Sequence, residues 1–537
     1  MTLADYSFQC DRLGRVCVYQ DGSSPTHSSS PGKSQPSIDH GLPSTESIAA
    51  PHDAMHVFDN FPVSPFGTYG SWGQPPLSVE PVGTLDGSPG FAPSNVDPLL
   101  LASSYVDPML HTVASADSNT NQQPINIAAS VPATAANVNK FPYFLEKLEP
   151  PFISHFDRYN WIRMRQYLAD LGSRDSMVAS AIIAVQALYE AEENGWDTTN
   201  AIALYYASKA SHATLLEELD PGFEPTIMAA FLLLCFEIVA QQETVPVTMK
   251  PEGAFVDKLE QWAKLRPWPP VACRVETWLK LLHVKALHLG GRGLMCAKVS
   301  RLLSYDSGPT PSLIFLDQHP SPPSILYDSL SSQLFEFYMQ TQKIGASLCG
   351  LNRHHRSRGS LMDETEVDHV AQNIRKQLQS LYQQRPSVLQ LRSEELRSVI
   401  PAPFANSLAT LIDLCNAAYH IEIVDLGRAH GQWLTPTPEA QEAMQHVRHI
   451  VDENFTQNSG AVSPGFMWPI FFYALEADEE GGKWAVRMLQ QIRRPTCHSD
   501  FFALFLEAVL DQQRQKGERV DCRYLCIEKF GIPPPFI

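Results

Sequence analysis

The sequence predicts an all-α protein, with one large multi-helix domain over residues 141–537 preceded by a long disordered linker. Three observations support this prediction. Apolar residues recur at helical spacing from about residue 141 to the end of the chain, and runs that alternate as a strand would are nearly absent. Residues 23–140 instead show no sustained period. A hydrophobic fraction of 44% over 537 residues supplies enough apolar side chains for such a domain.

Three segments illustrate the helical pattern. The segment 175–195 carries an apolar stripe that ends at Gly195, a typical helix stop. A second stripe follows along 325–348, and a third along 501–517, which Gly517 closes. The stripe residues are Val178, Ala181, Ile182, Val185 and Leu188 in the first, Leu326, Leu330, Leu334, Phe337, Ile344 and Leu348 in the second, and Phe501, Phe505, Ala508 and Val509 in the third.

The longest apolar run is short for a membrane span. It covers 227–236, whereas a helix that crosses a bilayer needs about 18 or more apolar residues. We therefore expect a buried core helix there and no membrane association. Proline-rich loops are expected at 305–324 and 383–403, and the segment Ser-Leu-Ile-Phe-Leu (312–316) is the best strand candidate.

The segment 23–140 has the composition of a disordered linker. It is rich in Ser, Pro, Gly, Asn and Ala, and between Asp21 and Lys140 it holds ten acidic residues against two lysines. Apolar residues cluster beside acids in "HDAMHVFDNFPVSPF" and "DPLLLASSYVDPML". Such mixtures are typical of activation segments, although a plain linker with a few apolar anchors explains them as well.

Charge and cysteine content narrow the class of protein. The formal net charge is −18 and the pI about 5.4, which argues against a chain that binds mainly nucleic-acid phosphates. Of the ten cysteines, several lie inside apolar helical patterns, as reduced intracellular cysteines do. We expect no disulfide framework and a cytosolic or nuclear setting.

Enzyme motifs are not found in the sequence. There is no G-x-S-x-G elbow, no phosphate-binding loop and no D-D-x-x-D metal motif of an all-α cyclase. The turn 288–293 joins two helical patterns, and Asp478, Glu479 and Glu480 fit a solvated turn. Metal sites at His354 and His355, or at His446 and His449, are disfavoured, and Trp262, Trp268 and Trp278 are expected in the core rather than around a ligand.

The first 22 residues carry a cysteine pair. In "FQCDRLGRVCVYQDG" Cys10 and Cys17 enclose Arg-Leu-Gly, and Tyr19 follows. This stretch resembles the closing part of a fungal zinc binuclear cluster, C-x-x-C-x-R-L-G-x-x-C-x-Y, in which six cysteines hold two zinc ions. Matching positions are Cys10, Arg12, Leu13, Gly14, Cys17 and Tyr19, whereas Ser7 stands where the fourth cysteine belongs.

The rest of the chain is similar to the same class of regulator. The segment 152–193 resembles the start of the fungal-specific transcription factor domain, including that of acriflavine sensitivity control proteins, and the diffuse likeness extends over 145–537. The resemblance implies a nuclear regulator of RNA polymerase II genes, of secondary metabolism or drug response, and not an enzyme. It implies promoter DNA as a partner if the cluster is complete, and transcription machinery or co-regulators.

The departure from the family pattern changes the expectation for zinc. Two thiolates, at Cys10 and Cys17, cannot supply the ligands of a two-zinc site, so we expect no stably bound zinc and no DNA binding by the family's mechanism. Either the gene model is short, or a natural regulator has lost its DNA-binding module and acts as a co-regulator. A helical interaction scaffold is the alternative from another class, and an all-α enzyme is the less favoured one. The oligomeric state is not predicted.

Overall fold

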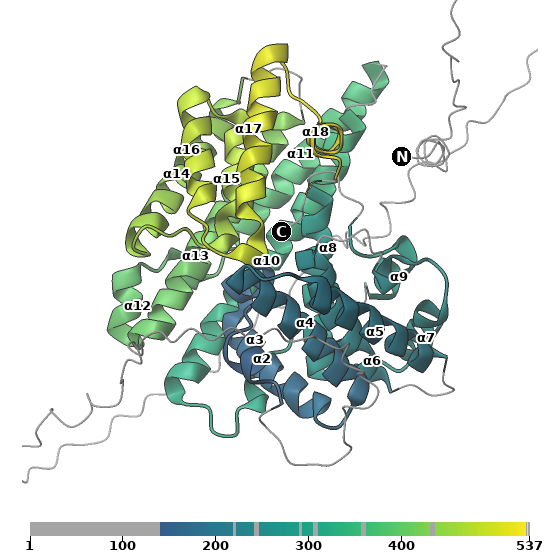
Figure 1. Cartoon of the computed structure of the whole chain (residues 1–537). Helices are drawn as coiled ribbons and strands as arrows, with labels where there is room; N and C mark the ends of the chain where they lie inside the picture. Colours follow the sequence, from purple (N-terminus) through teal and green to yellow (C-terminus); the bar gives the residue numbers. More distant parts are fainter. Residues whose placement is uncertain are drawn as a thin grey trace, which may run out of the picture. The chain divides into compact units, whose positions relative to one another are not determined.

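The described residues from 140 onward are mostly helical (Figure 1). The computed structural model describes residues 140–217, 222–240, 246–288, 293–303, 310–355, 361–429, 435–532 and 534, without the side chains of 350 and 352–363. The predicted cysteine segment 1–22 and nearly all of the predicted linker 23–140 lie outside this part. Because the described residues contain seventeen α-helices and no strand, the all-α prediction is confirmed.

The helices in chain order are α2 (Pro142–Glu146), α3 (Pro151–Gly172), α4 (Ser176–Asn194), α5 (Thr199–Leu216), α6 (Phe223–Ala240), α7 (Ala254–Ala263), α8 (Pro270–His288), α9 (Ala297–Leu303), α10 (Pro322–His355), α11 (Leu361–Gln383), α12 (Ser393–Val399), α13 (Ala402–Arg428), α14 (Pro438–Gln457), α15 (Met467–Glu476), α16 (Glu479–Gln490), α17 (Ser499–Lys516) and α18 (Cys522–Phe530). Short 3-10 turns, η3 (Val247–Met249), η4 (Ile314–Leu316), η5 (Ser387–Gln390), η6 (Pro464–Phe466) and η7 (Pro495–Cys497), lie between them.

Local sequence signals account for many helix ends. The Asp175 side chain accepts hydrogen bonds from two backbone N–H groups at the start of α4. Gly195 and Gly517 end α4 and α17 in the left-handed conformation, with φ of 65° and 66°, which glycine adopts without strain. Both glycine stops were predicted. The first stripe is confirmed too, since its five residues are all buried.

Two hydrophobic clusters form the core, and α13 contributes to both. The first cluster contains residues from α2 through α13, and the second contains residues from α13 through α18. Helix α6 lies inside the first, and every residue of the predicted core run 227–236 is buried there. By length and composition alone, α6 passes as a membrane span, but 78% of it is buried inside the protein.

One loop prediction is wrong in part, and the strand candidate is wrong. The segment 383–403 contains η5 and α12, because Glu395 accepts a hydrogen bond from the Arg392 backbone at 2.7 Å and Leu396 is buried. The strand candidate 312–316 forms the turn η4 instead. Its Leu313 N–H is taken by the Asn160 side chain and its Ile314 N–H by the Ser312 hydroxyl, so neither is free for strand pairing.

The second predicted apolar stripe is confirmed only in part. Leu334, Phe337 and Leu348 are buried, but Leu326 is 37% exposed because the first turns of α10 lie at the surface. In α17, Phe505, Ala508 and Val509 are buried and Phe501 is half-buried, so that stripe faces the core as expected.

Candidate functional site

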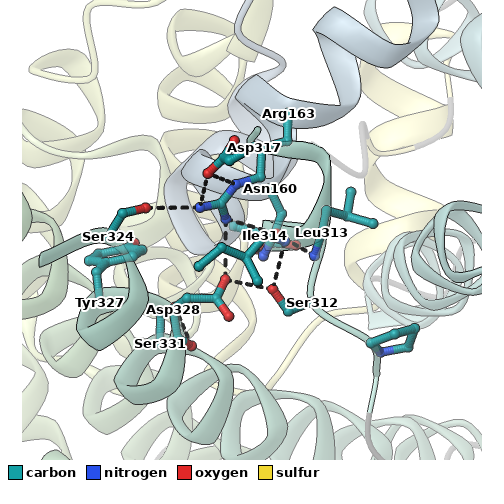
Figure 2. Close-up of polar contacts among 12 residues, drawn as sticks. Asn160, Arg163, Ser312, Leu313, Ile314, Asp317, Ser324, Tyr327, Asp328 and Ser331 are labelled. Atoms are coloured by element: carbon teal, nitrogen blue, oxygen red, sulfur yellow. Dashed lines mark hydrogen bonds and ion pairs between the residues drawn. The ribbon is translucent and has the colours of Figure 1, made fainter. Parts of the chain in front are cut away.

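Helix α3 carries a network of buried polar side chains (Figure 2). The Arg163 guanidinium donates to Asp317 at 2.9 and 3.0 Å and to Asp328 at 3.2 Å. It also donates to the Ser324 hydroxyl at 3.1 Å and to the Asn160 side-chain oxygen at 3.3 Å. Because two carboxylates face this one buried cation, the network ties the segment around η4 and the start of α10 to α3.

The same network continues through Asp157, which interrupts α3 with φ −143° and ψ 42°. Its carboxylate accepts hydrogen bonds from Arg274 and Trp278 of α8, both at 2.7 Å, and from Asn160 at 2.9 Å. Asp157 is 6% exposed and Arg274 is 1% exposed. None of these side chains has a buried polar atom without a partner, so this network holds helices together and offers no group for chemistry.

A second group of buried polar side chains lines a cavity of about 20 Å³ between α8, α10, α13 and α15. Lys285 and His288 lie three residues apart on the last turn of α8, and Glu422 and Asp425 lie three residues apart on α13. Residues at that spacing share one face of a helix, so each helix presents a pair of ionisable groups to the cavity. Its apolar wall includes Tyr338, Trp468 and Phe472.

Lys285 is a buried amine with no acidic partner in the described part of the chain. Its side chain is 5% exposed, and its Nζ lies 3.4 Å from His155 Nε2 and 5.4 Å from the ring centres of Phe156 and Tyr338. His155 Nδ1 contacts the Pro151 carbonyl, which makes Nδ1 the donor and leaves Nε2 to accept from Lys285. Burial lowers the pKa of Lys285 to about 7.

Burial and the adjacent lysine act in the same direction on His155. Both lower its pKa well below 6.5, burial being the larger cause, so that the ring stays neutral and can accept the lysine hydrogen bond at neutral pH. Room for this ring depends on Gly465, since a β-carbon there would lie 2.7 Å from His155 Cδ2.

Glu422 faces the same cavity with one oxygen unpaired. Its side chain is 2% exposed, Oε1 lies 3.5 Å from His288 Nε2, and Oε2 has no hydrogen-bond partner. Burial alone would lower the pKa of His288, but the Cys349 sulfur and the Glu422 carboxylate raise it well above 6.5. A buried acceptor without a donor is unfavourable by about 1–3 kcal/mol, so Oε2 marks a position for a polar partner.

Asp425 connects the cavity to a chain of ion pairs that leads away from it. Burial raises the pKa of Asp425 to about 6, against the opposing effect of Arg428, which lies 3.5 Å away. Arg428 pairs with Glu476 of α15, and Glu476 pairs in turn with Arg519 just before α18. These partners neutralise one another. The cavity therefore retains one amine without an acidic partner, that of Lys285, and one carboxylate oxygen without a hydrogen-bond partner, Glu422 Oε2.

Another cavity, of about 60 Å³, lies between α5, α6 and η3. Its buried acid, Glu237, accepts hydrogen bonds from Tyr205 and, at 3.1 Å, from Lys209. Because the acid is already paired, this cavity lacks the unmet carboxylate that distinguishes the first one.

The residues singled out by their sequence pattern lie elsewhere. Cys10 and Cys17 are outside the described residues, as are the side chains of His354 and His355 and most of the turn 288–293. His446 stacks on His420 at 4.5 Å, while His449 is exposed and pairs with Glu453. Within the described ranges, no three His, Cys, Asp or Glu residues are grouped as metal ligands would be.

Several further expectations are confirmed. The three tryptophans Trp262, Trp268 and Trp278 are all buried in the first core cluster. Asp478, Glu479 and Glu480 are exposed as expected, but they do not form a turn: Glu479 and Glu480 begin α16, and Asp478 caps it through the Gly481 N–H at 2.8 Å. All eight cysteines in the part that the structure describes are free thiols.

The cavity residues were missed in the sequence, although a weak signal exists. Lys285 follows Trp278 by seven residues and so falls on the same buried stripe of α8, where a charge is out of place. Glu422 likewise interrupts an apolar run in α13. No protein-family model, curated protein or solved structure matches the chain.

Proposed function

We propose that this chain is a fungal regulator of RNA polymerase II transcription that acts in the nucleus and is not an enzyme. The observation that carries the proposal is the match of Cys10, Arg12, Leu13, Gly14, Cys17 and Tyr19 to the closing part of a zinc binuclear cluster. The acidic, Ser/Pro-rich composition of 23–140 and the large all-α domain that follows agree with the layout of that class.

In this proposal each part of the chain has a separate role. The helical domain is the regulatory body, and residues 23–140 link it to the cysteine segment and contact the transcription machinery through apolar residues placed beside acids. Promoter DNA is a partner only where a complete cluster is present. The target programme, secondary metabolism or drug response, rests on the family resemblance alone.

A tethering experiment tests the proposal without depending on the cysteine segment. The full chain is fused to an unrelated DNA-binding module and expressed in a filamentous fungus with a reporter gene that carries the module's binding site. We expect altered reporter transcription and nuclear localisation of the untethered chain. Replacing Leu99, Leu100 and Leu101 by serine tests the activation segment, while replacing Ser103 and Ser104 by alanine is the matched control.

The same experiment separates the two alternatives. A co-regulator without DNA binding changes the reporter when tethered and captures nuclear partners. A helical interaction scaffold leaves the reporter unchanged, stains the cytosol and captures cytosolic partners, and that combination would contradict the proposal.

A further inference from the structure

Three arginines gather around one carboxylate beside the first half of α3. Arg158 Nη2 lies 3.4 Å from Glu149 Oε1, and Arg494 Nη2, just before η7, lies 3.7 Å from Glu149 Oε2. Arg165 donates from Nη1 to the carbonyl of Leu148, the residue before Glu149, at 2.9 Å. Three guanidinium groups thus share one acid, which leaves two positive charges in excess among these four side chains.

Arg165 is the member of this group whose donors are least satisfied. It is 6% exposed, and its Nε atom is buried without a hydrogen-bond partner. The Leu148 carbonyl, its single acceptor in the described part of the chain, also accepts from Trp161 Nε1 at 2.9 Å. Burial is the main cause that lowers the pKa of Arg165, Glu149 opposes it and Arg158 adds to it. A buried guanidinium with so few acceptors is stabilised by a further anionic partner.

The other two arginines are open to solvent. The side chains of Arg158 and Arg494 are 53% and 48% exposed, and their distances to Glu149 are longer than those of a close hydrogen-bonded ion pair. An exposed pair of this kind contributes little to stability, so little is lost when the guanidinium turns toward another acceptor. Each guanidinium has five N–H donors, most of which remain for a ligand.

We propose that the arginine cluster, Arg158, Arg165 and Arg494, binds a phosphorylated serine or threonine in a peptide segment of a partner protein. The phosphate carries nearly two negative charges at neutral pH, which matches the two positive charges in excess beside Glu149. Its oxygens accept from guanidinium groups that approach from α3 and from the loop before η7. This assignment rests on the cluster itself and is independent of the proposed role in transcription.

A peptide fits this surface better than nucleic acid does. Ile162, 37% exposed, lies one turn after Arg158 on α3 and offers an apolar contact for a residue next to the phosphate. Nucleic acid requires cations spread along a backbone, whereas this chain has a net charge of −18 and here gathers its cations around one point. An acidic side chain, with a single charge, would neutralise only part of the excess.

Fluorescence anisotropy of labelled peptide pools with the purified full chain tests the assignment. One pool carries phosphoserine between randomised flanking residues, a second carries serine at that place and a third carries glutamate. We expect the phosphoserine pool to bind at least tenfold more tightly than the serine pool, and more tightly than the glutamate pool. Inorganic phosphate and random duplex DNA serve as competitors, and each should displace the phosphoserine pool at least tenfold less effectively than the unlabelled pool does.

A double variant assigns the exposed contacts. Arg158→Gln combined with Arg494→Gln should weaken binding of the phosphoserine pool at least tenfold, because the two accessible cations of the cluster are lost. The matched control combines Lys483→Gln with Arg514→Gln, which removes the same net charge from two exposed ion pairs in other helices. Its affinity should stay within about twofold of that of the natural protein.

A conservative variant separates recognition by geometry from recognition by charge. Arg165→Lys keeps the positive charge but loses the planar fork of donors, so it should weaken binding at least threefold. Thermal unfolding of each variant without peptide verifies that it folds. If Arg165→Lys does not fold, the double variant of the exposed arginines decides the question.

Four results would overturn the assignment. The first is equal affinity for the phosphoserine and serine pools, or no binding of either, which leaves an ion-pair network only. The second is equal affinity for the glutamate pool, which indicates an ordinary acidic peptide. The third is binding that the double variant does not weaken more than its control does. The fourth is displacement by inorganic phosphate or duplex DNA as effective as displacement by the unlabelled peptide pool.

Discussion

Glu422 lies so close to Gly345 that a β-carbon on residue 345 would be 2.6 Å from the Glu422 Oε1 atom. Glycine inside a helix is less favourable than alanine by about 1 kcal/mol. At position 345 of α10 a larger residue would clash with the buried Glu422 carboxylate of α13. The glycine at position 345 is thus explained by Glu422, which lies 77 residues further along the chain.

The first prediction concerns this pair. We expect Gly345→Ala to destabilise the protein by about 1–3 kcal/mol, because the new methyl group overlaps the Glu422 carboxylate. In a Glu422→Ala background, the same change should stabilise by up to about 1 kcal/mol through helix propensity. Urea unfolding of the four proteins measures this coupling. An identical effect of Gly345→Ala in both backgrounds would show that the two residues do not interact.

The second prediction concerns the buried pair of Asp157 and Arg274. Asp157→Ala leaves the Arg274 guanidinium, 1% exposed, without its carboxylate, and should lower the free energy of unfolding by about 3–5 kcal/mol. Asp511→Ala, which breaks an exposed ion pair with Arg514, is the matched control and should have no measurable effect. If urea unfolding showed the same loss of free energy of unfolding for both variants, the buried Asp157–Arg274 pair would stabilise the protein no more than an exposed ion pair does.

The third prediction concerns the pH dependence of stability at Lys285. Its pKa is about 7 in the folded protein and near 10.5 when unfolded, so above pH 7 the unfolded chain binds more protons and Lys285 destabilises the fold less as pH rises. We expect Lys285→Met to have a higher free energy of unfolding than the natural protein. This difference should be greatest at or below pH 7 and should shrink by about 1.4 kcal/mol for each pH unit above 7.

Paired denaturation curves at several pH values from neutral to mildly alkaline measure that difference. Taking the difference between two proteins removes contributions that they share, such as those of the buried tyrosines. Lys280→Met, the same change on an outer face of α8, is the control, and its effect on stability should show no such slope. A constant difference between the natural protein and Lys285→Met would mean that Lys285 keeps an ordinary pKa.

The fourth prediction concerns thiol reactivity. Burial raises the pKa of Cys497 and Cys526 to about 12 and raises those of Cys235 and Cys415 further, so these thiols should resist alkylation. Half-buried Cys296, whose sulfur reaches the Lys250 carbonyl at 3.5 Å, should be labelled first among the eight described cysteines. Mass spectrometry after brief maleimide treatment of a Cys10→Ser, Cys17→Ser protein measures this order, with Cys296→Ser as the control.

The fifth prediction concerns zinc. Cys10 and Cys17 offer two thiolates, and a two-zinc cluster needs six, so the purified chain should hold less than one zinc ion. Elemental analysis after dialysis against a metal-free buffer measures the content, and Cys10→Ser is the control that should not change it. A stoichiometry of two zinc ions per chain would disprove our interpretation of the cysteine pair.

Patterns of neighbouring residues predicted much of the fold. The stripe from Val178 to Leu188 and the stops at Gly195 and Gly517 were correct because helix faces and helix ends depend on residues a few positions apart. The loop at 383–403 and the strand at 312–316 were wrong because their conformations depend on other segments. Asn160, for example, binds the Leu313 N–H from 153 residues away.

The candidate site, too, has features that local sequence patterns predict and others that depend on contacts between distant segments. The residues that line it come from α8, α10, α13 and α15, and no local pattern pairs Lys285 with Glu422. The apolar surroundings of each charge are visible in the sequence, but whether such a charge is paired, exposed or left unmet is not.

The sequence by itself therefore determined that this protein is helical, where many helices lie, and which residues resemble a zinc cluster. Only the tertiary structure decided that Asp157 meets Arg274, that Glu422 meets Gly345 and His288, and that Lys285 lies buried without an acid in the described chain. The physical reason is the distance along the chain over which each interaction acts. Helix propensity and capping act over a few residues, whereas the desolvation of a charge and its pairing depend on every helix that packs around it.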